Sequence, residues 1–483
     1  MNDGYLVVLD EGTTSTRAIL YHPGGAVVAA SQQPLDQIYP RPGWVEHDAE
    51  QIWQRTLACA RDVITRAGGA DRITAIGITN QRETVVAWDR RTGQPLCNAI
   101  VWQDRRTASM CDALRRDGHE VEVQRRTGLV LDPYFSGTKM RWVLDNVPAA
   151  RDTGPHLAFG TVESWLVHRL TAQGGDGTGS GQHISDASNA SRTMMLPLTG
   201  ATWDAGLAEL LGVPTAALPQ VVDTHGDLGR THPALFGAAI PLCGLAGDQQ
   251  AATIGQGCLK PGETKATFGT GAFVLANMGA TVPASTHRLL GTVLWQAGGV
   301  RHFALEGSVF VAGSLIQWLR DGLGLLNDAG ESEALARSVA DSGGVVLVPA
   351  LAGLGAPHWR ADARGAINGL TLATTRAHIA RAALESLAHQ CHDLASAFAA
   401  DGAEWDQLRI DGGMSANNWM AQDLADILNI VVERPAGVET TALGAAMLAA
   451  VGAGVYADLP SAAAAMRPAS THFLPAMPAD IRA

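Results

Sequence analysis

Two short turns rich in glycine and threonine carry the groups that bind phosphate in proteins. Residues 9–17, with the sequence LDEGTTSTR, follow the apolar run Tyr5–Leu9 and precede a second apolar run, Ala18–Tyr21. This pattern predicts a strand, a tight turn and a returning strand, so that backbone N–H groups, hydroxyls and a carboxylate meet at one point. Such a point suits a phosphate group and its metal ion. Residues 267–273, TFGTGAF, are similar in composition, which predicts two related lobes that close on one nucleotide.

The predicted strands end in an acidic residue at three places. Asp10, Asp248 and Asp411 each follow an apolar strand. Ligands of α/β proteins collect outside the carboxyl ends of the strands, so these carboxylates are candidate site residues. A single aspartate at such a position often only forms a turn or caps a helix. Three of them, together with two Gly-Thr turns, favour a binding site.

A cluster of polar residues follows the predicted strand at 73–79. The residues are Asn80-Gln81-Arg82-Glu83, and burying them is costly unless they meet solvent or a ligand. Arg82 supplies hydrogen-bond donors and Glu83 an acceptor, which suits a polyol because each of its hydroxyls donates and accepts. Trp102 and Tyr134 could supply an apolar wall and a phenolic donor. A surface ion pair with core aromatics explains the same residues equally well.

The elements that position these residues repeat in the two halves. In the first half, strands are predicted within 5–30 and at 73–79, a helix at 51–67, and a strand at 242–247. In the second half, strands are predicted around 265–276 and at 407–410, with helices at 311–323 and 378–400. The lobe boundary is predicted near residues 250–255. We therefore expect an α/β protein with an N-terminal lobe, 1–252, and a C-terminal lobe, 253–483, flanking a catalytic cleft.

Composition excludes several classes of protein. The net charge of −12 and the absence of a basic stripe argue against a nucleic-acid partner. The chain has lysine only at 139, 260 and 265, none of them in a P-loop motif, so phosphate must be held in another way. The six cysteines are scattered and indicate reduced thiols in a cytoplasmic protein. No secretory signal is visible, and the uncharged stretch 441–457 predicts a buried helix rather than a membrane span.

The same residues lie in longer motifs of a known family. Residues 134–146, YFSGTKMRWVLDN, and residues 365–370 with 378–385 fit its two signatures. The chain resembles the FGGY carbohydrate kinases along nearly its whole length. Further stretches at 42–48, 77–84, 102–107 and 247–250 resemble those of the members that phosphorylate glycerol.

This resemblance implies an actin-like, ribonuclease-H-like fold and ATP-dependent phosphorylation of glycerol at a terminal hydroxyl, giving sn-glycerol 3-phosphate. It implies that Thr13, Thr14, Ser15, Arg17 and Thr270 hold the phosphates of ATP, that Asp10 holds Mg²⁺, and that Gly313, Gln317, Gly413 and Asn417 contact the nucleotide. It implies that Arg82, Glu83, Trp102, Tyr134, Asp248, Gln249 and Phe273 surround glycerol, with Asp248 as the catalytic base. Relatives also suggest a homo-oligomer, a dimer or a tetramer.

Two positions depart from the family pattern. Glu11 stands where many relatives have Gln, and Glu163 stands where relatives often have Asp. Glu11 is expected to add a negative charge beside the first turn, which would either weaken ATP binding or act through Mg²⁺. Residues 229–237 lack the basic loop that binds fructose 1,6-bisphosphate in enteric relatives, so control of that kind is not expected.

Two alternative functions remain open. A kinase of the same family that acts on another polyol or a ketose would keep both Gly-Thr turns but lose the stretches at 80–83 and 102–106, which are intact. A non-catalytic, nucleotide-binding sensor with the actin fold would lack Asp10 or Asp248, and both are present.

Overall fold

A five-stranded sheet forms the core of the first half of the protein. The computed structural model describes residues 4–360, 362–437 and 439–482. The strand order is β12-β5-β1-β2-β3, and the strands are β1 (Tyr5–Glu11), β2 (Ser15–Tyr21), β3 (Val27–Pro34), β5 (Ile73–Asn80) and β12 (Leu242–Gly247). β1, β2 and β3 pair antiparallel, whereas β5 and β12 join β1 in parallel. The carboxyl ends of β1, β5 and β12 therefore meet at one edge.

The second half repeats this arrangement. Its sheet has the order β15-β16-β14-β13-β19-β20-β21, built from β13 (Thr264–Phe268), β14 (Ala272–Gly279), β15 (Leu290–Ala297), β16 (Val300–Val309), β19 (Gln407–Asp411), β20 (Val431–Pro435) and β21 (Ser470–Phe473). The five strands β16-β14-β13-β19-β20 match the first sheet in order and direction. The expected duplicated α/β, actin-like fold is confirmed by this repeat, which the residue identities do not display.

The helices predicted at 51–67, at 378–400 and in the stretch 441–457 are present close to those bounds, whereas helices at 418–428 and 459–466 were not predicted. The larger ones are α1 (Ala49–Arg66), α10 (Asp248–Gly255), α13 (Arg376–Ala400), α14 (Asn418–Leu428), α15 (Thr440–Gly452) and α16 (Leu459–Met466). Asp48 caps the start of α1, because its side chain accepts hydrogen bonds from two backbone N–H groups of the first turn. The helix predicted at 311–323 is divided into α11 (Gly313–Gln317) and a π-helical turn, Trp318–Gly322.

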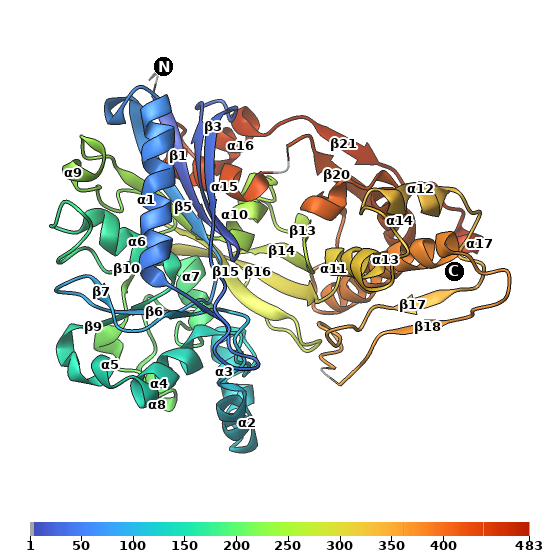
Figure 1. Cartoon of the computed structure of the whole chain (residues 1–483), viewed down its shortest axis with the longest axis horizontal. Helices are drawn as coiled ribbons and strands as arrows, with labels where there is room; N and C mark the ends of the chain where they lie inside the picture. The colour runs from blue at the N-terminus through green and yellow to red at the C-terminus, as the bar shows by residue number, and fades with distance from the viewer. Residues whose placement is uncertain (1–3, 361, 438, 483) are drawn as a thin grey trace.

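Smaller elements surround the first sheet. They include β6 (Val86–Asp89), β9 (Leu157–Gly160), α2 (Ala108–Arg116), α3 (Glu120–Thr127), α4 (Ser136–Asn146), α6 (Val162–Thr171), α7 (Ala187–Ala190) and α8 (Ala205–Leu210). In the second half, α12 (Glu331–Arg337) and the hairpin of β17 (Val346–Val348) and β18 (Ala366–Asn368) lie beside α13. Figure 1 shows β15 and β16 in the middle of the molecule, between the two halves.

Two helices from the end of the chain return to the first sheet. α15 contacts β12, β5, β1 and α10, and α16 packs against α15; Figure 1 shows both helices in red near the first sheet. One hydrophobic cluster accordingly contains Leu6 and Val8 of the first sheet, Leu275 of the second, and most of α15. The boundary between the two lobes at residues 252 and 253 stays a prediction. α15 and α16 come after this boundary in the chain but pack with the first lobe.

α15 is the buried helix expected in the uncharged stretch 441–457. Ten of its thirteen residues are buried. No helix in the described part of the chain is long and apolar enough to cross a membrane. α15 is instead surrounded by other parts of the protein, and it packs closely on α10 at glycine residues.

The contact between α10 and α15 leaves no space for side chains at two glycines. A Cβ atom at Gly444 would lie 1.8 Å from the carbonyl oxygen of Ala251, and one at Gly255 would lie 2.0 Å from that of Thr440.

We predict that Gly444→Ala lowers the free energy of unfolding by about 1–3 kcal/mol, because the helices must move apart. Gly206→Ala in α8 is the matched control, since its Cβ would have only ordinary contacts and alanine favours a helix. Urea unfolding measures both; an equally stable Gly444→Ala variant would contradict the packing described.

Candidate functional site

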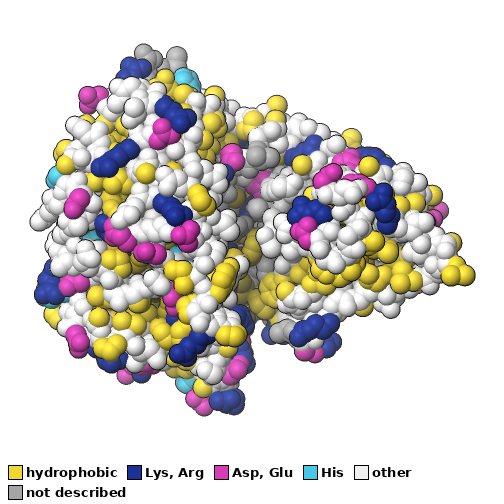
Figure 2. Space-filling view, in the orientation of Figure 1, with side chains coloured by type: hydrophobic (Ala, Val, Ile, Leu, Met, Phe, Trp, Pro, Cys, Tyr) yellow, Lys and Arg dark blue, Asp and Glu magenta, His cyan; other side chains and the backbone are white. Residues whose placement is uncertain are grey.

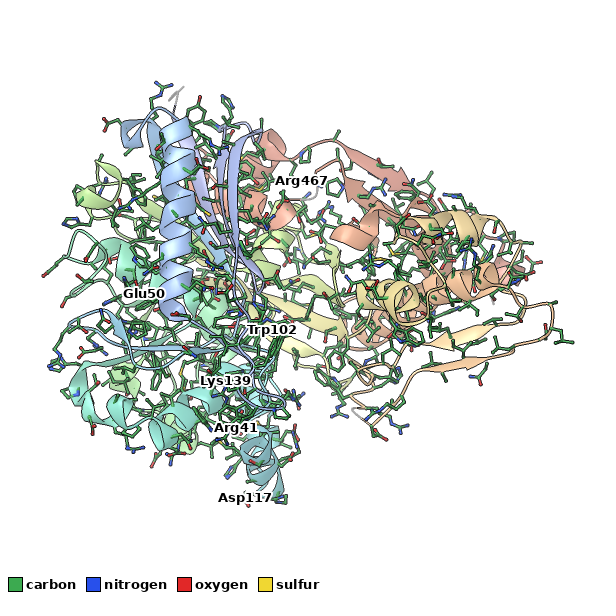
Figure 3. The ribbon with its side chains drawn as sticks, in the orientation of Figure 1. Arg41, Glu50, Trp102, Asp117, Lys139 and Arg467 are labelled. Carbon is green, nitrogen blue, oxygen red and sulfur yellow. The ribbon has the colours of Figure 1, made fainter. Side chains whose placement is uncertain are left out.

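The first Gly-Thr turn connects β1 to β2 and is fixed by bonds to its carbonyl groups. The side-chain amide of Gln81 donates to the carbonyl of Gly12 at 3.0 Å, and that of Gln37 donates to the carbonyl of Thr13 at 2.8 Å. The indole N–H of Trp102 donates to the Thr13 hydroxyl at 2.9 Å. The turn is thus held in one shape, and Trp102 lies directly beside it. Figure 3 shows Trp102 near the middle of the molecule in this view.

An arginine with two carboxylate partners lies beside this turn. Arg17 is directly opposite Asp10 in the β1–β2 register and forms an ion pair with it and a second, 2.6 Å ion pair with Glu439 at the start of α15. Burial raises the pKa of Asp10, while the Arg17 charge opposes this. The Arg17 side chain is 28% exposed, so it can reach a phosphate. The Thr13, Thr14 and Ser15 side chains lie in the same turn.

The second Gly-Thr turn, between β13 and β14, is capped by α11. The backbone N–H groups of Gly313 and Ser314 donate to the carbonyls of Gly269 and Thr270 at 2.9 and 3.1 Å. A Cβ at Gly313 would lie 2.5 Å from the Gly269 carbonyl oxygen, so only glycine permits this approach. Thr270 is exposed. Gly313 therefore brings α11 to the turn.

The other expected nucleotide residues gather around α11. Gln317 is exposed one helical turn after Gly313, so the two share a face. A Cβ at Gly313 would lie 3.3 Å from the Met414 side chain, which places Gly413 nearby. Asn417 caps α14 by accepting from the Met420 N–H at 2.9 Å. This capping bond gives Asn417 a structural role that the sequence did not predict.

The polar residues after β5 divide between two tasks. Asn80 donates to Glu163 at 3.1 Å and exchanges hydrogen bonds with Asn189. Its side chain therefore has a structural role in the protein interior. Gln81 holds the first turn. Arg82 and Glu83 are both buried; Arg82 lies beside Asp248 and Tyr134, and Glu83 accepts a hydrogen bond from Arg192. The backbone of Glu83 has φ = 64°, a conformation that non-glycine residues rarely adopt and that occurs often at functional sites.

Two aromatic residues bound the same space. The rings of Trp102 and Tyr134 are perpendicular, with centroids 5.6 Å apart. The Tyr134 hydroxyl lies 3.4 Å from Arg82 Nη2. Lys139, at the start of α4, fixes the Tyr134 loop by donating to the carbonyls of Pro133 and Tyr134, both at 2.6 Å. Burial lowers the pKa of Lys139 to about 8.

Asp248 completes the group from the carboxyl end of β12. It begins α10, its side chain is 34% exposed, and its Oδ1 lies 3.3 Å from Arg82 Nε. Burial raises the pKa of Asp248, and the charges of Arg82 and Lys265 oppose this rise. The charge of Asp10 also raises this pKa.

Lys265 is a member of the site that sequence reasoning missed. It is buried on β13 and donates to Gln249 Oε1 at 2.5 Å and to Thr267 Oγ1 at 2.9 Å. Burial lowers its pKa to about 8. Phe273 lies opposite Thr267 on β14. A lysine inside an apolar strand, in a chain with only three, is the signal that could have indicated it.

Asp411, the third strand-end acid, connects the second sheet to α15. It is buried at the end of β19 and accepts a hydrogen bond from Thr440, the first residue of α15. Its charge acts on Lys265. Lys265 is therefore influenced by strand-end acids of both sheets, Asp248 and Asp411. Figure 2 shows that the surface between the two halves is hollowed.

Glu11 does not add the negative charge that was expected beside the first turn. Strand alternation turns its side chain away from Asp10, toward Thr16 and Thr56, whose hydroxyls both donate to it. Burial raises its pKa to about 8, so the carboxyl is mainly neutral at pH 7. Glu163 is also buried, and its pKa is raised to about 7. Glu11 therefore acts in the core and not on a phosphate.

Comparison with known proteins relates this geometry to one family. Residues 5–255 and 264–453 match the N-terminal and C-terminal domains of the FGGY family of carbohydrate kinases. Glycerol kinase of Rhodospirillum centenum is 53% identical over 99% of this chain and 95% of its own, and that of Dechloromonas aromatica is 51% identical over 100% and 95%. The solved structure of Plasmodium falciparum glycerol kinase with ADP is 34% identical, with a TM-score of 0.92 over 99% of this chain and 96% of that one.

We predict that Glu11→Gln stabilises the protein as pH rises. The folded-state pKa of about 8 exceeds the ordinary value of 4.5. The stability that the protonated Glu11 carboxyl gives to the folded state is therefore fully present below pH 4.5 and is lost progressively up to about pH 8. The neutral amide avoids this loss, so the variant should gain about 3–5 kcal/mol relative to the wild type between these limits. Urea unfolding from pH 5 to 8 measures the gap, with the exposed Glu122→Gln as control; a gap that does not widen with pH contradicts a neutral Glu11.

Proposed function

The chain belongs to the FGGY family of carbohydrate kinases, and we propose that it transfers the γ-phosphoryl group of ATP to a terminal hydroxyl of glycerol, giving sn-glycerol 3-phosphate. One observation carries this proposal. The Tyr134 hydroxyl and the Asp248 carboxylate both lie within 3.4 Å of the Arg82 guanidinium, and Trp102, which contacts Tyr134, donates to the first Gly-Thr turn. The identity of more than 50% to glycerol kinases over the whole chain supports the same substrate.

The residues of the site match the chemistry of a small triol. Each hydroxyl of glycerol donates one hydrogen bond and accepts others. Arg82 offers N–H donors, and Glu83 and Asp248 offer carboxylate acceptors. Trp102 would cover the carbon chain from one side and Phe273 from the other, while Gln249 lies beside Asp248. A longer polyol would need space that Trp102 and Tyr134 occupy.

Phosphoryl transfer depends mainly on positioning and on charge stabilisation. Asp248 is the proposed base, since its carboxylate would accept the proton of the attacking hydroxyl. Arg17 and the turns carrying Thr13, Thr14, Ser15 and Thr270 would neutralise the phosphoryl oxygens. Gly313, Gln317, Gly413 and Asn417 would contact the rest of the nucleotide.

The residues beside the first turn fit Mg²⁺. The described residues contain no group of three or more His, Cys, Asp or Glu side chains that could hold a metal. Mg²⁺ commonly binds one or two carboxylates, water and the phosphates of a nucleotide, and Asp10 supplies such a carboxylate. When bound, Mg²⁺ would offset the negative charge of the phosphates. Arg17, now held by Asp10 and Glu439, would turn toward the same charge.

The alternatives have less support. The solved xylulose kinase of Rhodospirillum rubrum is 28% identical to this chain, with a TM-score of 0.85, well below the identity to the glycerol kinases. A nucleotide sensor without activity is disfavoured because Asp10 and Asp248 both lie at the site. We further propose that the protein is cytoplasmic, which the free thiols of all six cysteines support, and that it is a homo-oligomer, which the resemblance to its family alone supports.

Product analysis tests the proposed function directly. The protein is incubated with glycerol and Mg-ATP, and ³¹P NMR follows the phosphorus signals. We expect one new phosphomonoester that a stereospecific sn-glycerol 3-phosphate dehydrogenase oxidises completely. A product that this enzyme oxidises only in part, or no phosphomonoester at all, would reject the assignment.

We predict that Asp248→Asn lowers kcat by about a hundredfold or more, because the amide cannot accept the proton. The carboxamide keeps the size of the side chain, so the folded state and the affinity for ATP should change little. Steady-state kinetics with a thermal melt measures both properties. Turnover close to that of the wild type would remove Asp248 from the role of base.

We predict that Lys265→Met moves the acidic limb of the kcat/KM profile to higher pH. The Lys265 charge lowers the pKa of Asp248, so its removal raises that pKa, and more of the base is protonated at any acidic pH. The pH–rate profile measures the shift, and the exposed Lys260→Met is the control. An unchanged limb, or a shift to lower pH, would show that Lys265 does not act on the base.

A further inference from the structure

Four charged side chains form one buried cluster behind the glycerol site. They are Arg82, Glu83, Arg192 and Glu306, and each side chain is at most 1% exposed. Two positive and two negative charges balance within it. Burying such charges is costly unless each is paired with good geometry, so the contacts among the four decide how Arg82 and Glu83 are presented to a substrate.

Glu306 holds one edge of the Arg82 guanidinium. Nη1 of Arg82 donates to Oε2 of Glu306 at 2.6 Å, and Nη2 donates to Oε1 at 3.0 Å. This bidentate pair fixes the plane of the guanidinium. The remaining edge faces the site, because Nε lies 3.3 Å from Asp248 Oδ1 and Nη2 also lies 3.4 Å from the Tyr134 hydroxyl.

The same carboxylate also orients Glu83, through Arg192. Arg192 approaches Glu306 at 3.2 Å with both of its terminal nitrogens. Its Nε donates to Glu83 Oε1 at 2.6 Å. Both side chains expected to bind the hydroxyls of glycerol therefore depend on Glu306, one directly and one through a neighbour.

Glu306 comes from the opposite sheet. It lies in the middle of β16, paired with Leu275 of β14 and Leu290 of β15, whereas Arg82 and Glu83 follow β5 of the first sheet. Burial and backbone pairing on both sides leave Glu306 little freedom to move. The second sheet thereby supplies a fixed anionic point for two residues of the first.

We propose that Glu306 is a positioning residue for the polyol site, which aligns Arg82 and Glu83 for the hydroxyls of the acceptor and fixes this alignment to the second sheet. The proposal rests on the proposed function. It requires no contact between Glu306 and the substrate, so its removal should affect acceptor binding far more than ATP binding.

The test compares two buried carboxylates of the second sheet. Glu306→Gln removes one negative charge from the buried cluster. Glu433→Gln is the control, because it removes a buried negative charge from β20, where Glu433 pairs with Arg409 at 3.0 Å and with Arg467 at 2.7 Å. Losing one partner of a buried pair has a large effect on the groups that remain. We expect Glu306→Gln to raise KM for glycerol at least about tenfold with KM for ATP within about twofold, and Glu433→Gln to change neither.

A charge-balanced variant keeps the test decisive if Glu306→Gln does not fold. Arg192→Met combined with Glu306→Gln removes one charge of each sign and leaves Arg82 with Glu83. It should fold and show the same selective rise in KM for glycerol, while Glu306→Asp should recover part of the affinity because it keeps the charge.

Two results separate the inference from the function on which it rests. Equal effects on KM for glycerol and for ATP, or an effect no larger than that of Glu433→Gln, would overturn the role of Glu306. Absence of glycerol phosphorylation by the wild type itself would overturn the proposed function instead.

Discussion

The bidentate pair between Arg82 and Glu306 is the contact on which the rest of the site depends, because it joins the two sheets beside the substrate space. Both side chains are buried, so each charge needs the other to be stable inside the protein. The pair forms only when β16 lies against the end of β5. Packing of the two halves therefore also orients the Arg82 guanidinium in the polyol site.

Strand alternation assigns different tasks to two neighbouring acids at the phosphate side. Asp10 faces Arg17 and the turn, where the partly exposed guanidinium could exchange its carboxylate partners for phosphate. Glu11 faces the core, where burial keeps it mainly neutral. The duplicated topology places a second Gly-Thr turn on the other sheet, and Lys265 lies between the strand ends of the two halves. Positive charge is thus concentrated where a nucleotide would need it.

Local patterns predicted the strands that carry the two Gly-Thr turns and the strand-end acids, and also helices α1, α13 and α15, because each depends on hydrophobic period and on glycine at a few positions. Arg82, Tyr134 and Asp248 were also predicted, since their polar or aromatic side chains follow apolar strands or lie in a family motif. Arg192, Lys265 and Glu306 were not, because their partners are distant in sequence and only the tertiary fold brings them together. The return of α15 and α16 to the first sheet was missed for the same reason, as was the direction of the Glu11 side chain.

The central claim is that the buried polar cluster positions a three-carbon triol for phosphoryl transfer. The most direct measurement is ADP release with Mg-ATP and glycerol, dihydroxyacetone, erythritol, xylulose or water alone as acceptor. We expect rapid release with glycerol and little with the larger acceptors or with water, because Trp102 and Tyr134 would limit the space and because water makes too few contacts to be positioned for transfer. Faster release with erythritol or xylulose, or equal release in water alone, would contradict it.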